Sequence, residues 1–141
     1  MYKTFNVKKT ISGKLPFGED ILESLKKVAK SENIRVANIH ILGAVRNATI
    51  GFYNQSMKEY TSLKFYEPME IVSSLGNVSI KSDDIFIHLH VTLSDKEGKA
   101  LGGHLMSPTE IFACEFTIQE LEGDALVRKY DERTGLYLWD L

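Results

Sequence analysis

Apolar and polar side chains alternate along most of this chain, with the two-residue period of a half-buried β-strand. The clearest case is the segment Ile85–Ser94, whose odd positions are all aliphatic and whose even positions after Phe86 are polar. Clusters of Gly, Pro, Asn, Asp and Ser separate such segments and mark turns, among them one at Gly43. The predicted strands are Tyr2–Ser12, Arg35–Leu42, Ala44–Tyr53, Glu59–Tyr66, Glu70–Ile80, Ile85–Ser94, Lys99–Met106, Glu110–Glu120 and Ala125–Lys129.

One segment has the helical period instead. From about Glu19 to Glu32, apolar side chains starting at Ile21 recur at i, i+1, i+4, i+7 and i+8 and form one stripe. Acidic residues occupy the first turn and lysines lie toward the end, and both placements suit the helix dipole. Asn33 is expected to end the helix.

These elements predict an α+β fold with one main helix packed on a twisted, largely antiparallel β-sheet. Short connections between successive strands favour antiparallel pairing, and the helix buries its stripe most simply against the sheet. The 141 residues fit a single domain, 1–141, that is large enough to bury a core without disulfides. The C-terminal segment Leu136–Trp139 is too apolar for a free tail, so we expect it to pack on the body or against a neighbouring subunit.

Net charge, cysteine content and hydropathy indicate where the protein is located and which partners it binds. The net charge is −2, whereas duplex-DNA-binding proteins usually carry a strongly basic face. The single cysteine, Cys114, cannot form an internal disulfide and fits a reducing compartment. The N-terminus lacks the apolar core of a signal peptide, and no apolar run approaches the roughly 18 residues of a membrane-spanning helix. We therefore expect a cytoplasmic protein with no membrane partner.

The strand Ile85–Ser94 carries the chemically distinctive residues. Its aliphatic face goes to the core, so His88 and His90 share the other face with Thr92. Lys96-Glu97-Gly98 fits a three-residue hairpin loop with glycine in the left-handed conformation. Counting outward from that loop, Thr92 faces Gly102 and His90 faces His104. A two-residue loop would instead put His104 on the opposite face.

In this register three imidazoles lie close enough to share one ion. Directly opposite Cβ atoms are roughly 5 Å apart and diagonal ones roughly 7–8 Å or less. The predicted metal ligands are therefore His88, His90 and His104, with zinc as the default ion, although nickel, copper and iron also accept imidazoles. The alternative is that these histidines are polar residues on a solvated strand face.

Two glycines and a threonine beside the histidines suggest room for a ligand. Glycine in a strand often marks a bulge or a close approach, and Gly102 is expected to leave open space opposite Thr92. Three protein ligands with space for a fourth are typical of an open metal site. Thr92, Gly102 and Gly103 are accordingly predicted to line a site for a bound small molecule.

Other polar residues give weaker signals. His40 has no other potential metal ligand at a suitable spacing, so we interpret it as a packed or surface residue. Cys114 lies in an apolar strand and reads as a buried, inert thiol. Glu115 is either a residue that orients a histidine or a surface or inter-subunit residue.

At this point the residues resemble a known family, the "plants and prokaryotes conserved" (PPC) domain. The resemblance runs in order along about the whole chain and rests on His88–Asp95, Gly98, Gly102–Leu105, Gly18–Ile21, Gly43–Val45 and Met69–Val78. It implies a sheet-and-helix subunit that assembles as a homotrimer, with a metal site at His88, His90 and His104 in some prokaryotic members. One departure is Ser107-Pro108, where the family tends to have glycine.

The DNA-binding label that is often attached to this family transfers poorly to this chain. In plants the domain follows an AT-hook, a short Arg-Gly-Arg-Pro-type segment, and no such segment occurs here.

Three functions stay open at this stage. The first is a metal-binding trimer whose open coordination position takes water or a small anion, and any enzymatic role would use the metal as a Lewis acid or to activate water. No catalytic base is identifiable. The second is a DNA-binding or regulatory protein, and the third is a structural or protein-interaction trimer with incidental histidines. A DNA-binding surface would need basic residues on one face, for which the candidates are Lys3, Lys8, Lys9, Lys14, Lys26, Lys27 and Lys30.

Overall fold

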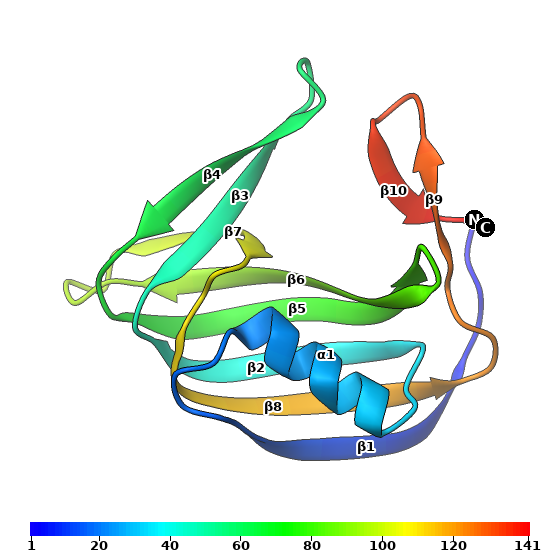
Figure 1. The fold of residues 1–141 in the computed structure, drawn as a ribbon, viewed down its shortest axis with the longest axis horizontal. Coiled ribbons are helices and arrows are strands. Elements are labelled where there is room, and N and C mark those ends of the chain that lie inside the picture. The colour runs from blue at the N-terminus through cyan, green and yellow to red at the C-terminus, as the bar shows by residue number, and fades with distance from the viewer.

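The computed structural model describes residues 1–141 and consists of a large curved antiparallel sheet, one helix and a small C-terminal hairpin (Figure 1). The eight-stranded sheet has the order β1-β8-β2-β5-β6-β7-β3-β4, and β9 pairs with β10 separately. The predicted α+β class is confirmed. The elements are β1 (Asn6–Leu15), α1 (Ile21–Ser31), β2 (Ala37–Val45), β3 (Ala48–Asn54), β4 (Glu59–Phe65), β5 (Met69–Lys81), β6 (Asp84–Ser94), β7 (Ala100–Met106), β8 (Ile111–Glu122), β9 (Arg128–Asp131) and β10 (Leu136–Trp139).

The predicted helix and its buried stripe are confirmed. Ile21, Leu25 and Ala29 are fully buried and belong to the same core cluster as Ile39 of β2 and Leu89 of β6. In Figure 1, α1 lies across one face of the sheet. As predicted, the helix ends before Asn33, whose φ of 54° lies in the left-handed region where asparagine often ends helices. No helix is both long enough and apolar enough to cross a membrane.

The predicted turn at Gly43 is wrong, because β2 runs through this residue to Val45. Gly43 has a φ of 138°, and a Cβ atom there would meet the backbone of Ala113 on β8, lying 2.9 Å from its carbonyl carbon. The glycine thus allows two neighbouring strands to approach each other closely. The chain turns after β2, at Arg46 and Asn47, which connect it to β3.

The chain ends also differ from the prediction. The first strand begins at Asn6, not Tyr2, and the predicted strand Ala125–Lys129 is replaced by β9, which begins at Arg128. The apolar segment Leu136–Trp139 forms β10, which was not predicted as a strand. The backbone N–H of Asp140 donates to the carbonyl of Val127, and a bridge joins Val127 to Ile80 of β5. The C-terminal segment therefore packs on the body, one of the two arrangements expected.

Asp20 fastens the start of α1 to the loop between β7 and β8. Its Oδ1 accepts hydrogen bonds from the backbone N–H of Glu23 at 3.0 Å and from the Ser107 hydroxyl at 2.8 Å. Its Oδ2 accepts a hydrogen bond from the backbone N–H of Thr109, a buried residue, at 2.8 Å. One carboxylate thus caps the helix and satisfies a buried donor in the loop that contains Ser107-Pro108.

Replacing Asp20 with alanine is expected to lower the free energy of unfolding by about 2–4 kcal/mol. The lost N-cap contributes about 1 kcal/mol, and leaving the N–H of Thr109 unpaired costs about 1–3 kcal/mol. Urea denaturation at fixed protein concentration measures the change. Asp124→Ala, at an exposed residue, is the matched control, and equal stability of the two variants would contradict the capping role.

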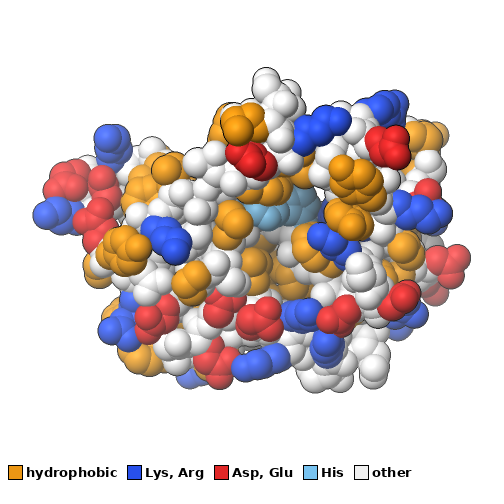
Figure 2. Space-filling view, turned by 45° about the horizontal axis from the view of Figure 1, so that its top comes forward, with side chains coloured by type: hydrophobic (Ala, Val, Ile, Leu, Met, Phe, Trp, Pro, Cys, Tyr) orange, Lys and Arg blue, Asp and Glu red, His pale blue; other side chains and the backbone are white.

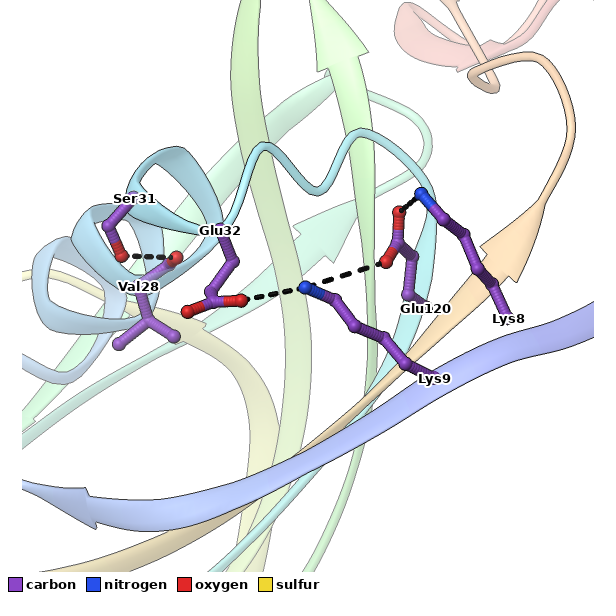
Figure 3. A network of polar contacts seen from close by, with 6 residues as sticks. All are labelled: Lys8, Lys9, Val28, Ser31, Glu32 and Glu120. Atoms are coloured by element: carbon purple, nitrogen blue, oxygen red, sulfur yellow. Dashed lines mark hydrogen bonds and ion pairs between the residues drawn. The ribbon is translucent and has the colours of Figure 1, made fainter.

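Most lysines proposed for a basic surface are paired with carboxylates. Lys8 contacts Glu120 at 2.9 Å and Lys9 contacts Glu32 at 2.7 Å (Figure 3). These two ion pairs join β1 to β8 and to the residue that follows α1. On the helix, Lys26 and Lys30 both contact Asp84, and Lys27 contacts Glu19. Each lysine of α1 is therefore engaged by a carboxylate, with Lys26 and Lys30 sharing one.

Candidate metal centre

The hairpin between β6 and β7 has the predicted register. His90 lies opposite His104 and Thr92 lies opposite Gly102. The backbone N–H of Asp95 donates to Lys99, and Gly98 has a φ of 77°, as expected for a three-residue loop closed by a left-handed glycine. His88, His90 and His104 therefore lie on one face of the sheet, opposite the face that packs against α1.

The three imidazoles converge. One ring nitrogen from each lies within 4.8 Å of the others. The Nδ1 of His104 and the Nε2 of His90 are 3.4 Å apart. Two ligands bound tetrahedrally at zinc–nitrogen distances of 2.0–2.1 Å are separated by about 3.4 Å, so this pair already has suitable spacing. The donor set fits a divalent transition metal.

The surroundings favour neutral imidazoles. Burial lowers the pKa of His88 to about 4, and the nearby His104, Arg128 and His90 add to the effect. The pKa of His104 is also lowered to about 4, first by burial and then by His90 and Arg128. At neutral pH these rings therefore hold lone pairs for a metal ion.

Arg128 of β9 contacts His88 from the C-terminal hairpin. Its Nη2 lies 3.3 Å from Nδ1 of His88 and donates to Oδ1 of Asn77 at 3.1 Å. Since arginine only donates hydrogen bonds, Nδ1 of His88 is the acceptor in this contact, so the single lone pair of a neutral His88 points at Arg128 and a metal ion bound by His88 replaces this contact. No pattern in the sequence pointed to Arg128, because this residue lies far along the chain from the histidines and in no recognisable motif.

The structure changes the interpretation of the two glycines. A Cβ atom at Gly102 would meet the carbonyl oxygen of Val91 and lie 3.2 Å from the Cα of Thr92. One at Gly103 would lie 2.8 Å from the carbonyl oxygen of Gly51. Both glycines thus let β7 approach its neighbours, since the place that a Cβ atom of Gly102 would take is occupied by the backbone of β6. A shallow hollow of about 270 Å³ does lie beside His90, lined in part by Thr92, Gly102 and Gly103.

A larger cleft opens on the other side of the histidines. Its volume is about 400 Å³, and it lies between the β3–β4 hairpin and the β9–β10 hairpin. Figure 2 shows histidine side chains at the bottom of a hollow between raised flanks. The lining includes His88, His104, Arg128, Lys81, Phe86, Tyr53, Tyr60 and Tyr137. Of these, Phe86 was identifiable from the sequence, because it precedes His88 by two residues on the same strand face.

The other polar residues considered lie apart from the cluster. Glu115 is exposed on β8, which β2 and β5 separate from β6, so it does not orient a histidine. His40 is exposed, with Nδ1 3.3 Å from the carbonyl oxygen of Ser74. Cys114 is buried, and burial raises the pKa of its thiol to about 11, in agreement with an inert residue.

The fold and the site together define an α+β protein with a three-histidine cluster on one hairpin. The chain belongs to the Plants and Prokaryotes Conserved (PCC) domain family, whose sequence model matches residues 2–122. The resemblance found in the sequence is thereby confirmed. No curated protein matches the chain.

Three solved structures are similar over nearly the whole chain. A metal-containing protein of Archaeoglobus fulgidus is 42% identical, with a TM-score of 0.94, and the match covers 99% of this chain and 98% of that one. A PPC protein of Pyrococcus horikoshii is 35% identical, with a TM-score of 0.94, and the match covers 100% and 97%. A candidate DNA-binding protein of Bacteroides thetaiotaomicron is 28% identical, with a TM-score of 0.85 and 98% of each chain covered.

Proposed function

We propose that this protein binds one divalent metal ion, zinc by preference, through His88, His90 and His104. The observation that carries the proposal is the convergence of three imidazole nitrogens within 4.8 Å. Three imidazoles bind zinc well, and a tetrahedral ion then keeps one position for water or a small ligand. The similarity to a protein described as metal-containing, at 42% identity, supports the same conclusion.

We also propose that the subunits assemble as a homotrimer, as the family resemblance implies. Strands β2, β5 and β8 expose large apolar side chains in the single chain, with Leu42 58%, Leu75 68% and Phe112 59% exposed. Large apolar side chains exposed on neighbouring strands of one sheet are often covered by a partner. The single buried cysteine suits a cytoplasmic location.

DNA binding is the less well supported alternative. Two similar structures are described as candidate DNA-binding proteins. Phosphate contacts require lysines and arginines that are free to bind, whereas the lysines of α1 are paired with Asp84 and Glu19. Steep salt dependence of DNA affinity would favour this alternative.

The metal content of protein purified without added metal tests the main proposal. Elemental analysis by mass spectrometry is expected to find about one transition-metal ion per chain. A chelator is expected to remove this ion, and added zinc is expected to replace it. Light scattering on the same samples is expected to give the mass of three chains. A trimer that carries no metal and does not take up zinc would contradict the metal site and indicate a structural or protein-interaction role.

A further inference from the structure

Three cationic side chains line the cleft beside the histidine cluster without a carboxylate partner: Arg128, Lys81 and Lys58, and the ammonium group of Lys58 donates to the carbonyl of Glu132. Neither Arg128 nor Lys81 takes part in any ion pair of the chain, unlike the lysines of α1. Lys81 places its ammonium group 4.1 Å from the ring centre of Tyr137 and 5.2 Å from that of Phe86. The cleft thus combines positive charge with aromatic walls.

The hydrogen bonds of Arg128 go only to neutral acceptors. Its Nε donates to the hydroxyl of the fully buried Ser79 at 2.8 Å, and its Nη1 donates to the carbonyl of Tyr137 at 3.0 Å. Its Nη2 donates to Oδ1 of Asn77 and to Nδ1 of His88. A guanidinium group has five N–H donors, so these four contacts fix its plane and leave one donor free.

The positive charge of Arg128 is also poorly solvated. Arg128 is only partly exposed, so its guanidinium group is not fully hydrated. Partly buried charges are usually paired, and an anion in the cleft would supply the missing partner. Glu59 is the one carboxylate among the lining residues, and it is exposed at the rim.

The shape and the donors of the cleft select the class of anion. Its volume of about 400 Å³ suits a small molecule. Because Lys58 is held by the carbonyl of Glu132, the free guanidinium donor of Arg128 and the ammonium group of Lys81 remain, and these match a single carboxylate. Phosphate sites, in contrast, usually present many backbone N–H groups at a helix N-terminus or a nest. Phe86 and Tyr137 line the cleft, with Lys81 and Arg128 near their rings, and supply aromatic contacts for a ligand. The hollow beside Thr92 is smaller and has no arginine or lysine in its lining.

We infer that this cleft binds a small aromatic carboxylic acid, with its carboxylate between Arg128, Lys81 and the metal ion and its ring against Phe86 and Tyr137. The inference rests on the proposed metal site for one of the three contacts to the carboxylate. Carboxylate oxygens are ordinary zinc ligands, so one group can satisfy both the metal and the arginine. Arg128 and the β9–β10 hairpin, which lies beyond the segment matched by the family model, then determine which ligand is accepted.

Benzoate is the probe that tests this inference, with benzamide as its uncharged analogue. Trp139 is the only tryptophan, and its ring centre lies 5.7 Å from the guanidinium carbon of Arg128, so its fluorescence reports on the cleft. Titration of the zinc-loaded protein is expected to show saturable binding of benzoate and none of benzamide. Arg128→Gln and Lys81→Gln are each expected to weaken benzoate binding at least about tenfold, the effect of losing one charge-assisted hydrogen bond.

Matched controls separate the possible failures. Lys27→Gln removes a surface lysine far from the cleft and is expected to leave benzoate affinity unchanged. Calorimetry repeats the titration without relying on Trp139, and the zinc content of every sample is measured. Unchanged affinity in Arg128→Gln and Lys81→Gln, or equal binding of benzamide, would overturn the inference.

The metal contact has its own test. Benzoate is expected to bind at least about tenfold more weakly after chelation, since a direct metal ligand is then lost. If benzoate binds equally well before and after chelation, its carboxylate does not contact the metal ion, even if the protein binds zinc. If the wild-type protein takes up no zinc, the proposed function fails by itself, and Arg128-dependent binding of benzoate to the same protein would still support the carboxylate cleft.

Discussion

Replacing His104 with alanine is expected to weaken zinc binding more than about 100-fold, since removing even a group that only orients a metal ligand costs about 10–100-fold. His104 is the one ligand supplied by β7, while His88 and His90 come from β6. The variant therefore tests whether the two strands share one ion. Competition with a chromophoric chelator measures the affinity.

His40→Ala is the matched control for this experiment. It removes an exposed histidine of β2 that lies outside the cluster, so zinc affinity is expected to match that of the wild type. Circular dichroism checks that His104→Ala keeps its fold, as expected for a side chain that is only half-buried. Equal zinc affinity in the His104 and His40 variants would show that the ion, if bound, is held elsewhere.

Replacing Gly43 with alanine is expected to destabilise the fold by about 3 kcal/mol or more. The new methyl group would meet the backbone of Ala113 and would lie 3.0 Å from the Cα of Cys114, so two central strands would have to separate. Overpacking of this kind costs about 1–3 kcal/mol, and the φ of 138° adds strain for any residue with a side chain. Urea denaturation measures the loss.

Gly98→Ala provides the comparison. Gly98 also has a positive φ, of 77°, but nothing lies within 4 Å of a Cβ atom placed there. Its replacement is expected to cost about 1 kcal/mol, the conformational penalty alone. If the two variants are equally stable, the close approach of β2 and β8 at Gly43 is not the reason for that glycine.

The hairpin that holds the histidines was predictable because its determinants are local. Alternation assigned the two faces of β6, and Gly98 at the end of the loop set the register, so the position opposite His90 followed by counting. The stripe of α1 likewise identified the residues that are buried, because a helical face depends only on spacing.

The remaining features depend on contacts between distant parts of the chain. The sequence around Gly43 suggests a turn. Only the neighbouring strand β8 shows that this glycine lets β2 and β8 approach each other closely. Arg128 follows β6 by many residues, and no local pattern indicates that β9 would place it on His88. The walls of the cleft were missed for the same reason, since they come from two separate hairpins.

The location of all three imidazoles on one short hairpin also limits what a metal ion contributes to folding. An ion that joins only β6 and β7 closes a small loop, and closing a small loop removes little conformational entropy from the unfolded chain. The broad core beneath the sheet forms without that constraint. In a zinc finger, metal binding and folding are one event. We expect this domain, in contrast, to keep its native structure when no metal ion is bound.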